Sequence, residues 1–202
     1  MKKKRRMNKV KEKKIYILLT DTGTLLTKII RYYTKYPLNH ASICFDPNLL
    51  EVYSFGRKNP KNPFFGGFVK EDIKSPIFNE SECALYCFNV TDEEWNRTRE
   101  YLKKFEESEY RYNFIGLFGF LINTPIKRKK AFFCSQFIAT VLSECRLANF
   151  DKPIPLIAPY DLELIPGLQL VYKGKLKDYI RGLKVARENR LDLPMPFIPV
   201  EM

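Results

Sequence analysis

The chain has 202 residues, of which 45% are apolar and 14% aromatic, a composition typical of one globular domain and not of a disordered chain. Its net charge of +12 is concentrated at the start, because residues 1–14 hold nine Lys or Arg and one Glu, which leaves +4 for the rest of the chain. We interpret residues 1–14 as a basic disordered tail that an anionic membrane surface would attract. No aromatic residue interrupts these charges, so the tail predicts no specific nucleic-acid partner.

Two apolar runs, at residues 15–19 and 114–122, fall well short of the roughly 20 residues that a membrane-spanning helix needs. The five cysteines follow no disulfide spacing; they are Cys44, Cys83, Cys87, Cys134 and Cys145. Unpaired thiols are typical of reducing compartments, so we expect a cytoplasmic protein. His40 is the single histidine, and no spacing predicts a metal site or an organic cofactor.

The remaining sequence predicts strands and helices in one domain over residues 15–185, followed by an extended Pro-rich tail at 186–202. Expected strands cover 15–19, 40–45, 50–55, 84–90 and 168–172, and expected helical or apolar elements cover 25–33, 92–107, 110–122 and 132–145. The element at 92–107 has the clearest start, because Thr91 and Glu94 match a capping box. Residues 56–67 are rich in Pro, Asn and Gly and predict a long loop that could cover a site.

The strands at 40–45 and 50–55 predict a hairpin with two unlike faces, because side chains alternate along a strand. We assign one apolar face (Ala41, Ile43, Phe45, Leu50 and Val52) and one partly polar face (His40, Ser42, Cys44, Glu51 and Tyr53). The only imidazole of the chain therefore lies on the polar side of the hairpin.

Cys134 lies where a basic loop at 127–130 enters the apolar helix at 132–145. A thiol in the first turn of a helix meets the positive end of the helix dipole, which favours the nucleophilic thiolate. An unpaired cysteine is also common as an inert core residue, so position alone leaves both interpretations open. His40 is the only base available to a mechanism that needs a thiol and an imidazole.

Four segments resemble the circularly permuted branch of the NlpC/P60 superfamily, which includes the YiiX-like and the lecithin:retinol acyltransferase-like proteins. They are residues 36–43 (Tyr-Pro-Leu-Asn-His-Ala-Ser-Ile), 52–56 (Val-Tyr-Ser-Phe-Gly), 133–137 (Phe-Cys-Ser-Gln-Phe) and 158–162 (Ala-Pro-Tyr-Asp-Leu). In the last of these, Asp161 would cap a helix. The resemblance covers residues 15–172 and depends on the order and spacing of the four segments.

The resemblance implies an α+β, permuted papain-like fold, in which a small antiparallel sheet carries His40 and packs against the helix of Cys134. It implies a cysteine hydrolase with Cys134 as nucleophile and His40 as base. Such proteins place a Glu or a second His on the strand after the histidine, whereas this chain has Tyr53 there and a carboxylate at Glu51. Either residue would orient His40, with Tyr53 the first choice.

Three functions remain open from the sequence. The first is an amidase or peptidase that acts on a small peptide or amide. The second is an acyltransferase or thioesterase that acts on an acyl lipid at a membrane surface. The third is a binding module that keeps the fold without catalysis, because the expected carboxylate is missing at Tyr53.

Overall fold

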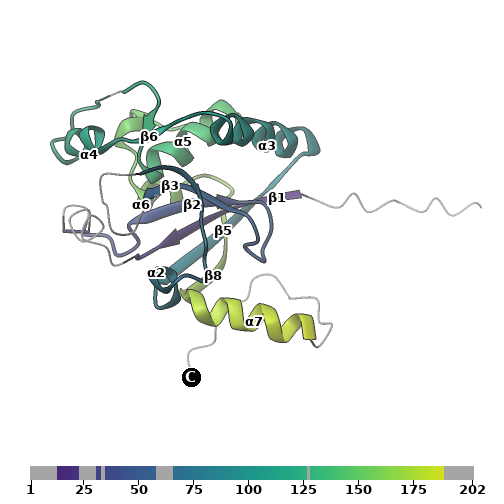
Figure 1. The fold of residues 1–202 in the computed structure, drawn as a ribbon. Coiled ribbons are helices and arrows are strands. Elements are labelled where there is room, and N and C mark those ends of the chain that lie inside the picture. Colours follow the sequence, from purple (N-terminus) through teal and green to yellow (C-terminus); the bar gives the residue numbers. More distant parts are fainter. Residues whose placement is uncertain (1–12, 23–30, 33–34, 58–65, 127, 189–202) are drawn as a thin grey trace, which may run out of the picture.

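The computed structural model describes all residues except 1–12, 23–30, 33–34, 58–65, 127 and 189–202. It is an α+β fold, as the sequence predicts, built on one six-stranded antiparallel sheet with strand order β4-β3-β2-β1-β5-β8 (Figure 1). The strands are β1 (Lys13–Thr20), β2 (His40–Cys44), β3 (Val52–Arg57), β4 (Gly66–Lys70), β5 (Glu82–Val90) and β8 (Gln169–Lys175).

Helices cover both faces of the sheet. They are α2 (Pro76–Asn79), α3 (Asp92–Glu106), α4 (Phe114–Leu121), α5 (Cys134–Glu144), α6 (Pro159–Glu163) and α7 (Leu176–Glu188), with a 3₁₀ turn at Ile154–Leu156. In Figure 1, α3 and α5 lie on one side of the sheet and α2 and α7 on the other. A short parallel pair, β6 (Arg111–Tyr112) and β7 (Ala131–Phe132), brings the segment before α4 beside the start of α5.

Strand β1 is apolar along most of its length because it supplies side chains to two cores. Ile15, Ile17 and Leu19 belong to the core under α3 and α5, whereas Tyr16 and Leu18 belong to the core under α2 and α7. A strand covered on both faces needs a continuous apolar run and not an alternating one. Lys13 and Lys14 are part of this strand, so the predicted basic tail extends two residues too far.

The core on the α5 side is centred on an aromatic cluster. Phe55 is fully buried, and its ring lies 5.0 Å from that of Phe137 on α5 and 6.0 Å from that of Phe105 on α3. Phe68 on β4 packs against the same three rings. These contacts fix helix α5 against β2 and β3, and therefore fix the position of Cys134 at its first turn.

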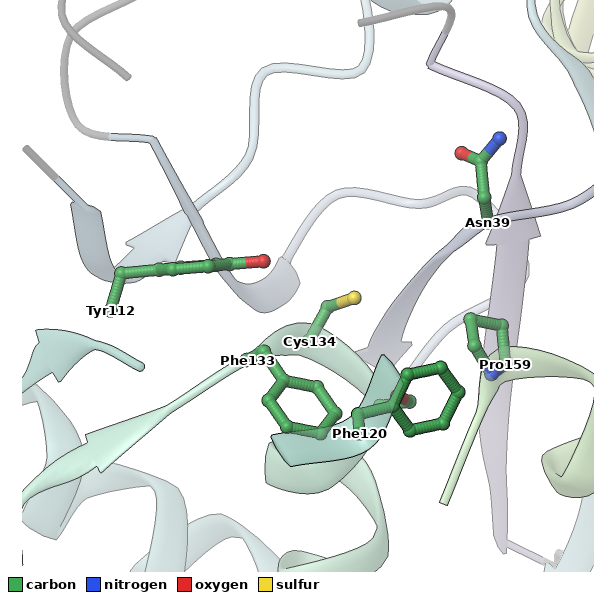
Figure 2. A pocket seen from close by; sticks show the side chains of 7 residues that line it. Asn39, Tyr112, Phe120, Phe133, Cys134 and Pro159 are labelled. Atoms are coloured by element: carbon green, nitrogen blue, oxygen red, sulfur yellow. The ribbon is translucent and has the colours of Figure 1, made fainter. Parts of the chain in front are cut away.

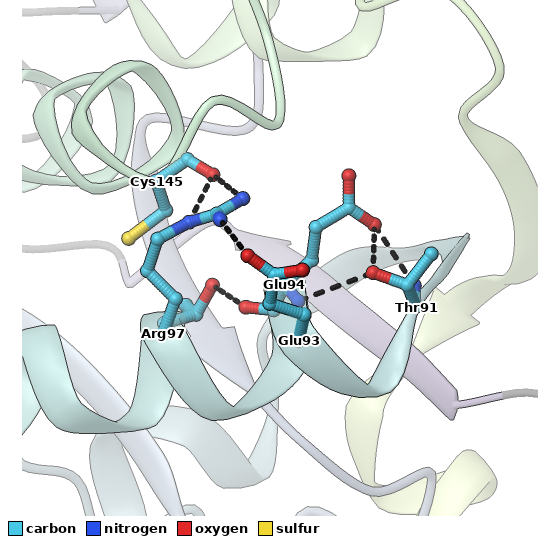
Figure 3. Close-up of polar contacts among 6 residues, drawn as sticks. Thr91, Glu93, Glu94, Arg97 and Cys145 are labelled. Carbon is cyan, nitrogen blue, oxygen red and sulfur yellow. Dashed lines mark hydrogen bonds and ion pairs between the residues drawn. The ribbon is translucent and has the colours of Figure 1, made fainter.

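Helix α3 begins as predicted and holds the far end of α5. Thr91 and Glu94 form the reciprocal bonds of a capping box (Figure 3). Arg97 then donates from Nε and Nη2 to the carbonyl of Cys145, at 3.0 and 2.8 Å. A guanidinium at the C-terminus of α5 complements its dipole, so the two helices are joined at the end opposite Cys134.

Several predicted elements differ from the structure. The loop at 56–67 is shorter than expected, because both of its ends pair in the β3–β4 hairpin, with Gly56 opposite Gly67. Its centre, like most of the helix expected at 25–33, lies outside the described residues. Helix α7 was not predicted, and it extends past the expected end of the domain at residue 185. Within the described part of the chain, no helix is both long and apolar enough to cross a bilayer.

Candidate active site

The site is built from the first residue of β2 and the first residue of α5. His40 opens β2, opposite Thr20 of β1, and its side chain therefore lies at the end of the sheet. Cys134 opens α5, which packs on β2 and β3. The Cys134 thiol lies close enough to His40 to act on the pKa of its side chain. The structure thus brings together the two residues that the sequence selects as nucleophile and base.

Glu71 supplies the carboxylate of the site. Its Oε1 lies 2.6 Å from His40 Nε2, and its Oε2 accepts a bond of 2.7 Å from the Ser42 hydroxyl. The side chains of His40 and Glu71 are 12% and 7% exposed, so water has little access to the pair. Ser54 completes the arrangement, because its hydroxyl donates to the Ala41 carbonyl and lies 3.3 Å from His40 Nε2.

The electrostatics of His40 follow from these contacts. Burial by itself lowers the pKa of His40, because the imidazolium is removed from water. The charge of Glu71 and the hydrogen bond and charge of Cys134 act in the opposite direction, and together they raise the pKa of His40 well above its ordinary value of 6.5. The site therefore favours a protonated His40 between two partners that can carry negative charge.

The predicted orienting residues, Tyr53 and Glu51, lie elsewhere. Tyr53 pairs with Ile43 and therefore shares the face of Ile43, which is not the face of His40. Its ring is buried and stacks on Phe68 at 5.7 Å. Glu51 instead pairs with Lys70 at 3.0 Å and with an arginine of α3 at 3.2 Å.

The prediction for these two residues was wrong because the assumed hairpin register was shifted by one residue. In the structure Cys44 pairs with Val52, so the residues of β3 that share a face with His40 are Val52 and Ser54. Glu71 was missed because it follows β4, in a segment that the sequence left unassigned. The β-favouring pair Phe68 and Val69, next to Gly67, is a weak local signal of that strand.

The other four cysteines lie deeper than Cys134, which is 4% exposed. Cys44, Cys83, Cys87 and Cys145 are all at most 1% exposed. The pKa of each of these thiols is raised, mainly by burial. The pKa of Cys83 is raised to about 12. Thiols of this kind react slowly because little thiolate forms.

Cys134 opens onto a pocket, which Figure 2 shows from close by. The labelled lining residues come from five separate segments; they are Asn39, Tyr112, Phe120, Phe133, Cys134 and Pro159. The walls are mostly aromatic and apolar, and the sulfur of Cys134 points into the space between Tyr112 and Asn39. The residue before Cys134 is Phe133, which has no side-chain oxygen to cap the helix, so the first N–H groups of α5 remain available to a ligand.

The fourth segment of the resemblance, residues 158–162, forms the wall of this pocket at Pro159. Asp161 lies in the first turn of α6, where its carboxylate accepts a 2.6 Å bond from the Ala158 N–H. The residue that precedes the helix is Ala158, so Asp161 is not the cap residue that the sequence predicts. Ser135 joins α5 to this region by a buried 2.7 Å bond to the Ile157 carbonyl.

Comparisons with protein-family models, curated proteins and solved structures give no match for this chain. Among the described residues, no group of three or more His, Cys, Asp or Glu side chains is placed to hold a metal ion.

Proposed function

We propose that this protein is a cysteine hydrolase in which Cys134, His40 and Glu71 act together, on a permuted papain-like fold of the NlpC/P60 type. One observation carries the proposal: the His40 side chain contacts the Glu71 carboxylate, and the Cys134 thiol is near enough to raise the pKa of the same imidazole. A nucleophile, a base and a group that orients the base are the three parts that this chemistry needs. An amidase or peptidase is the first choice among the open functions, and its substrate would be a small peptide or amide.

In the proposed reaction, His40 takes the thiol proton and the Cys134 sulfur attacks the acyl carbon of the substrate. Because Nε2 faces Glu71, the other ring nitrogen, Nδ1, is the one left to exchange protons with the thiol and the substrate. The leaving amine departs with the proton from His40, and a thioester remains on Cys134. Water then attacks the thioester, loses a proton to His40 and releases the acid, which restores the thiol.

Glu71 and the first turn of α5 have separate roles in this reaction. Glu71 holds the imidazole ring and stabilises its charged form, as its effect on the pKa of His40 indicates. The uncapped N–H groups of α5, that of Cys134 among them, are suitable donors to the oxyanion of the tetrahedral intermediate.

Two alternatives rest on weaker support. A lipid-directed acyltransferase is favoured by two exposed apolar residues near the pocket residue Phe120. They are Ile115 on α4 and Ile122 just after it, which are 52% and 69% exposed. Exposed Arg128, Lys129 and Lys130 follow this helix and would attract an anionic membrane. The non-catalytic binding module was favoured only by the missing carboxylate at Tyr53, and Glu71 supplies a carboxylate beside His40 from a different segment.

The test is site-resolved alkylation with iodoacetamide, followed by mass spectrometry of each cysteine. We expect Cys134 to be labelled at least ten times faster than the other four thiols, and the His40→Ala variant to lose most of this advantage. Cys145, which lies at the other end of the same helix, is the internal control. Labelling of Cys134 no faster than that of Cys145, and unchanged in His40→Ala, would rule out an activated thiol.

A further inference from the structure

The pocket beside Cys134 contains one polar side chain whose bonding is incomplete. Asn39, the residue before His40, is 2% exposed. Its amide nitrogen donates at 3.1 Å both to Asp21 Oδ1 and to the Pro37 carbonyl. Its amide oxygen is buried and accepts no hydrogen bond within the described part of the chain. In Figure 2 this oxygen is turned toward the side of Tyr112 and Cys134, and the nitrogen is turned away.

These partners determine which end of the amide faces the pocket. Asp21 and Pro37 both present oxygen atoms, which can only accept, so exchanging the nitrogen and oxygen of Asn39 would put two acceptors against each other. Asn39 therefore presents an acceptor to the pocket and cannot donate to an oxyanion. A buried acceptor without a donor costs free energy, which a ligand that brings an N–H group would recover.

We propose that Asn39 Oδ1 accepts a hydrogen bond from an N–H group of the substrate close to the attacked carbonyl. This inference rests on the proposed function and makes its substrate class more specific. The substrate is then a peptide-like amide, because the acyl chain and ester oxygen of a lipid offer no such donor. The aromatic walls at Tyr112, Phe120 and Phe133 would pack on the apolar part of the same substrate.

The experiment compares two alkylating reagents that differ in N–H groups. Iodoacetamide carries two N–H bonds, two bonds away from the carbon that the sulfur attacks, and N,N-dimethyliodoacetamide carries none. With each, a carbon–sulfur bond forms, iodide leaves and the thiol proton is lost to the base. The rate at Cys134 in the full chain is divided by the rate of glutathione with the same reagent, which removes intrinsic reactivity.

In the wild-type protein we expect the normalised rates to favour iodoacetamide by about tenfold, the size of one hydrogen bond to a buried partner. Asn39→Leu and Asn39→Ser should lower this preference to the level set by the difference in size between the two reagents, near the level seen with glutathione. Glu51→Gln, which changes a surface residue outside the pocket, is the control and should keep the preference. Thermal unfolding verifies that each variant is folded. If Asn39→Leu is not folded, the comparison uses Asn39→Ser alone.

Equal normalised rates in the wild-type protein would overturn the inference, as would a preference that survives in the folded Asn39 variants. Equal rates are also the result expected if the Asn39 oxygen serves only a bound water. Failure of the proposed function has a different signature, since the rates of both reagents would then be insensitive to His40→Ala. The preference is a ratio measured on one thiol, so it reports on Asn39 in either case.

Discussion

Nε2 of His40 lies 2.6 Å from Oε1 of Glu71, although 31 positions separate the two residues along the chain. The pair forms because β2, β3 and β4 are neighbouring antiparallel strands, so Glu71, which follows β4, lies only two strands away from His40. The Glu71 N–H donates to the Val52 carbonyl at 2.8 Å and so continues the β3–β4 pairing by one residue. The backbone pairing of the β3–β4 hairpin therefore fixes the position of Glu71.

Replacing Glu71 should reduce the reactivity of Cys134 more than replacing the carboxylate that the sequence suggested. We expect Glu71→Gln to lower the rate of Cys134 alkylation at pH 7 by at least tenfold, because the variant loses the charge that favours protonated His40. Glu51→Gln is the matched control and should change the rate less than twofold, since Glu51 pairs with Lys70 at the surface. Equal losses in the two variants would contradict the assignment of Glu71.

Protonation of His40 should make the stability of the protein depend on pH in a definite direction. Because the pKa of folded His40 is above the unfolded value of about 6.5, its protonation stabilises the folded state. This stabilisation is complete below pH 6.5 and is lost as the pH rises through the folded-state pKa. Urea titrations should therefore find a larger difference in unfolding free energy between the wild type and Glu71→Gln at pH 6 than at pH 9. A difference that is the same at both pH values would show that the pair is not linked to protonation of His40.

Tyr53→Phe should leave the site intact. The Tyr53 ring stacks on Phe68 on the face of Ile43, so this residue does not act on His40. We expect the Cys134 labelling rate to change less than twofold, while the free energy of unfolding falls by about 1 kcal/mol at most, because the buried ring keeps its packing. A large fall in labelling without a loss of stability would restore Tyr53 as an orienting residue.

Phe55→Ala should destabilise the whole domain, since Phe55 is fully buried and contacts rings from β4, α3 and α5. The expected loss is about 3–5 kcal/mol in urea unfolding, typical of a large aromatic residue removed from a core. Phe55→Leu, which fills part of the cavity, should cost clearly less. Similar small losses for both variants would mean that α5 does not depend on this cluster.

Ser135→Ala tests the bond that joins the start of α5 to the segment before α6. The Ser135 hydroxyl is buried and donates at 2.7 Å to the Ile157 carbonyl. Its removal leaves that carbonyl without this donor, and we expect a loss of about 1–3 kcal/mol in unfolding free energy. Ser143→Ala, near the other end of the same helix, should change stability by less than about 0.5 kcal/mol. Equal losses of unfolding free energy in the two variants would show that the Ser135–Ile157 bond adds no stability of its own.

The sequence by itself determined the features that depend on near neighbours. The capping box at Thr91 and Glu94 located the start of α3, and the change from a basic loop to an apolar helix placed Cys134 in the first turn of α5. His40 needed no structural information as the candidate base, because the chain has no other histidine. Even α7 follows a helical spacing through Leu176, Tyr179 and Leu183, although it was not predicted.

The tertiary structure decided which residues complete the site. The register of β2 against β3 is set by side chains packed across the whole sheet, and a shift of one residue exchanges the two faces. That shift separates Tyr53, which lies in the core, from Ser54, which lies beside His40. Strand pairing likewise brings Glu71 to His40, and packing brings Asn39 to the pocket of Cys134. No local pattern of residues records such contacts between distant parts of the chain.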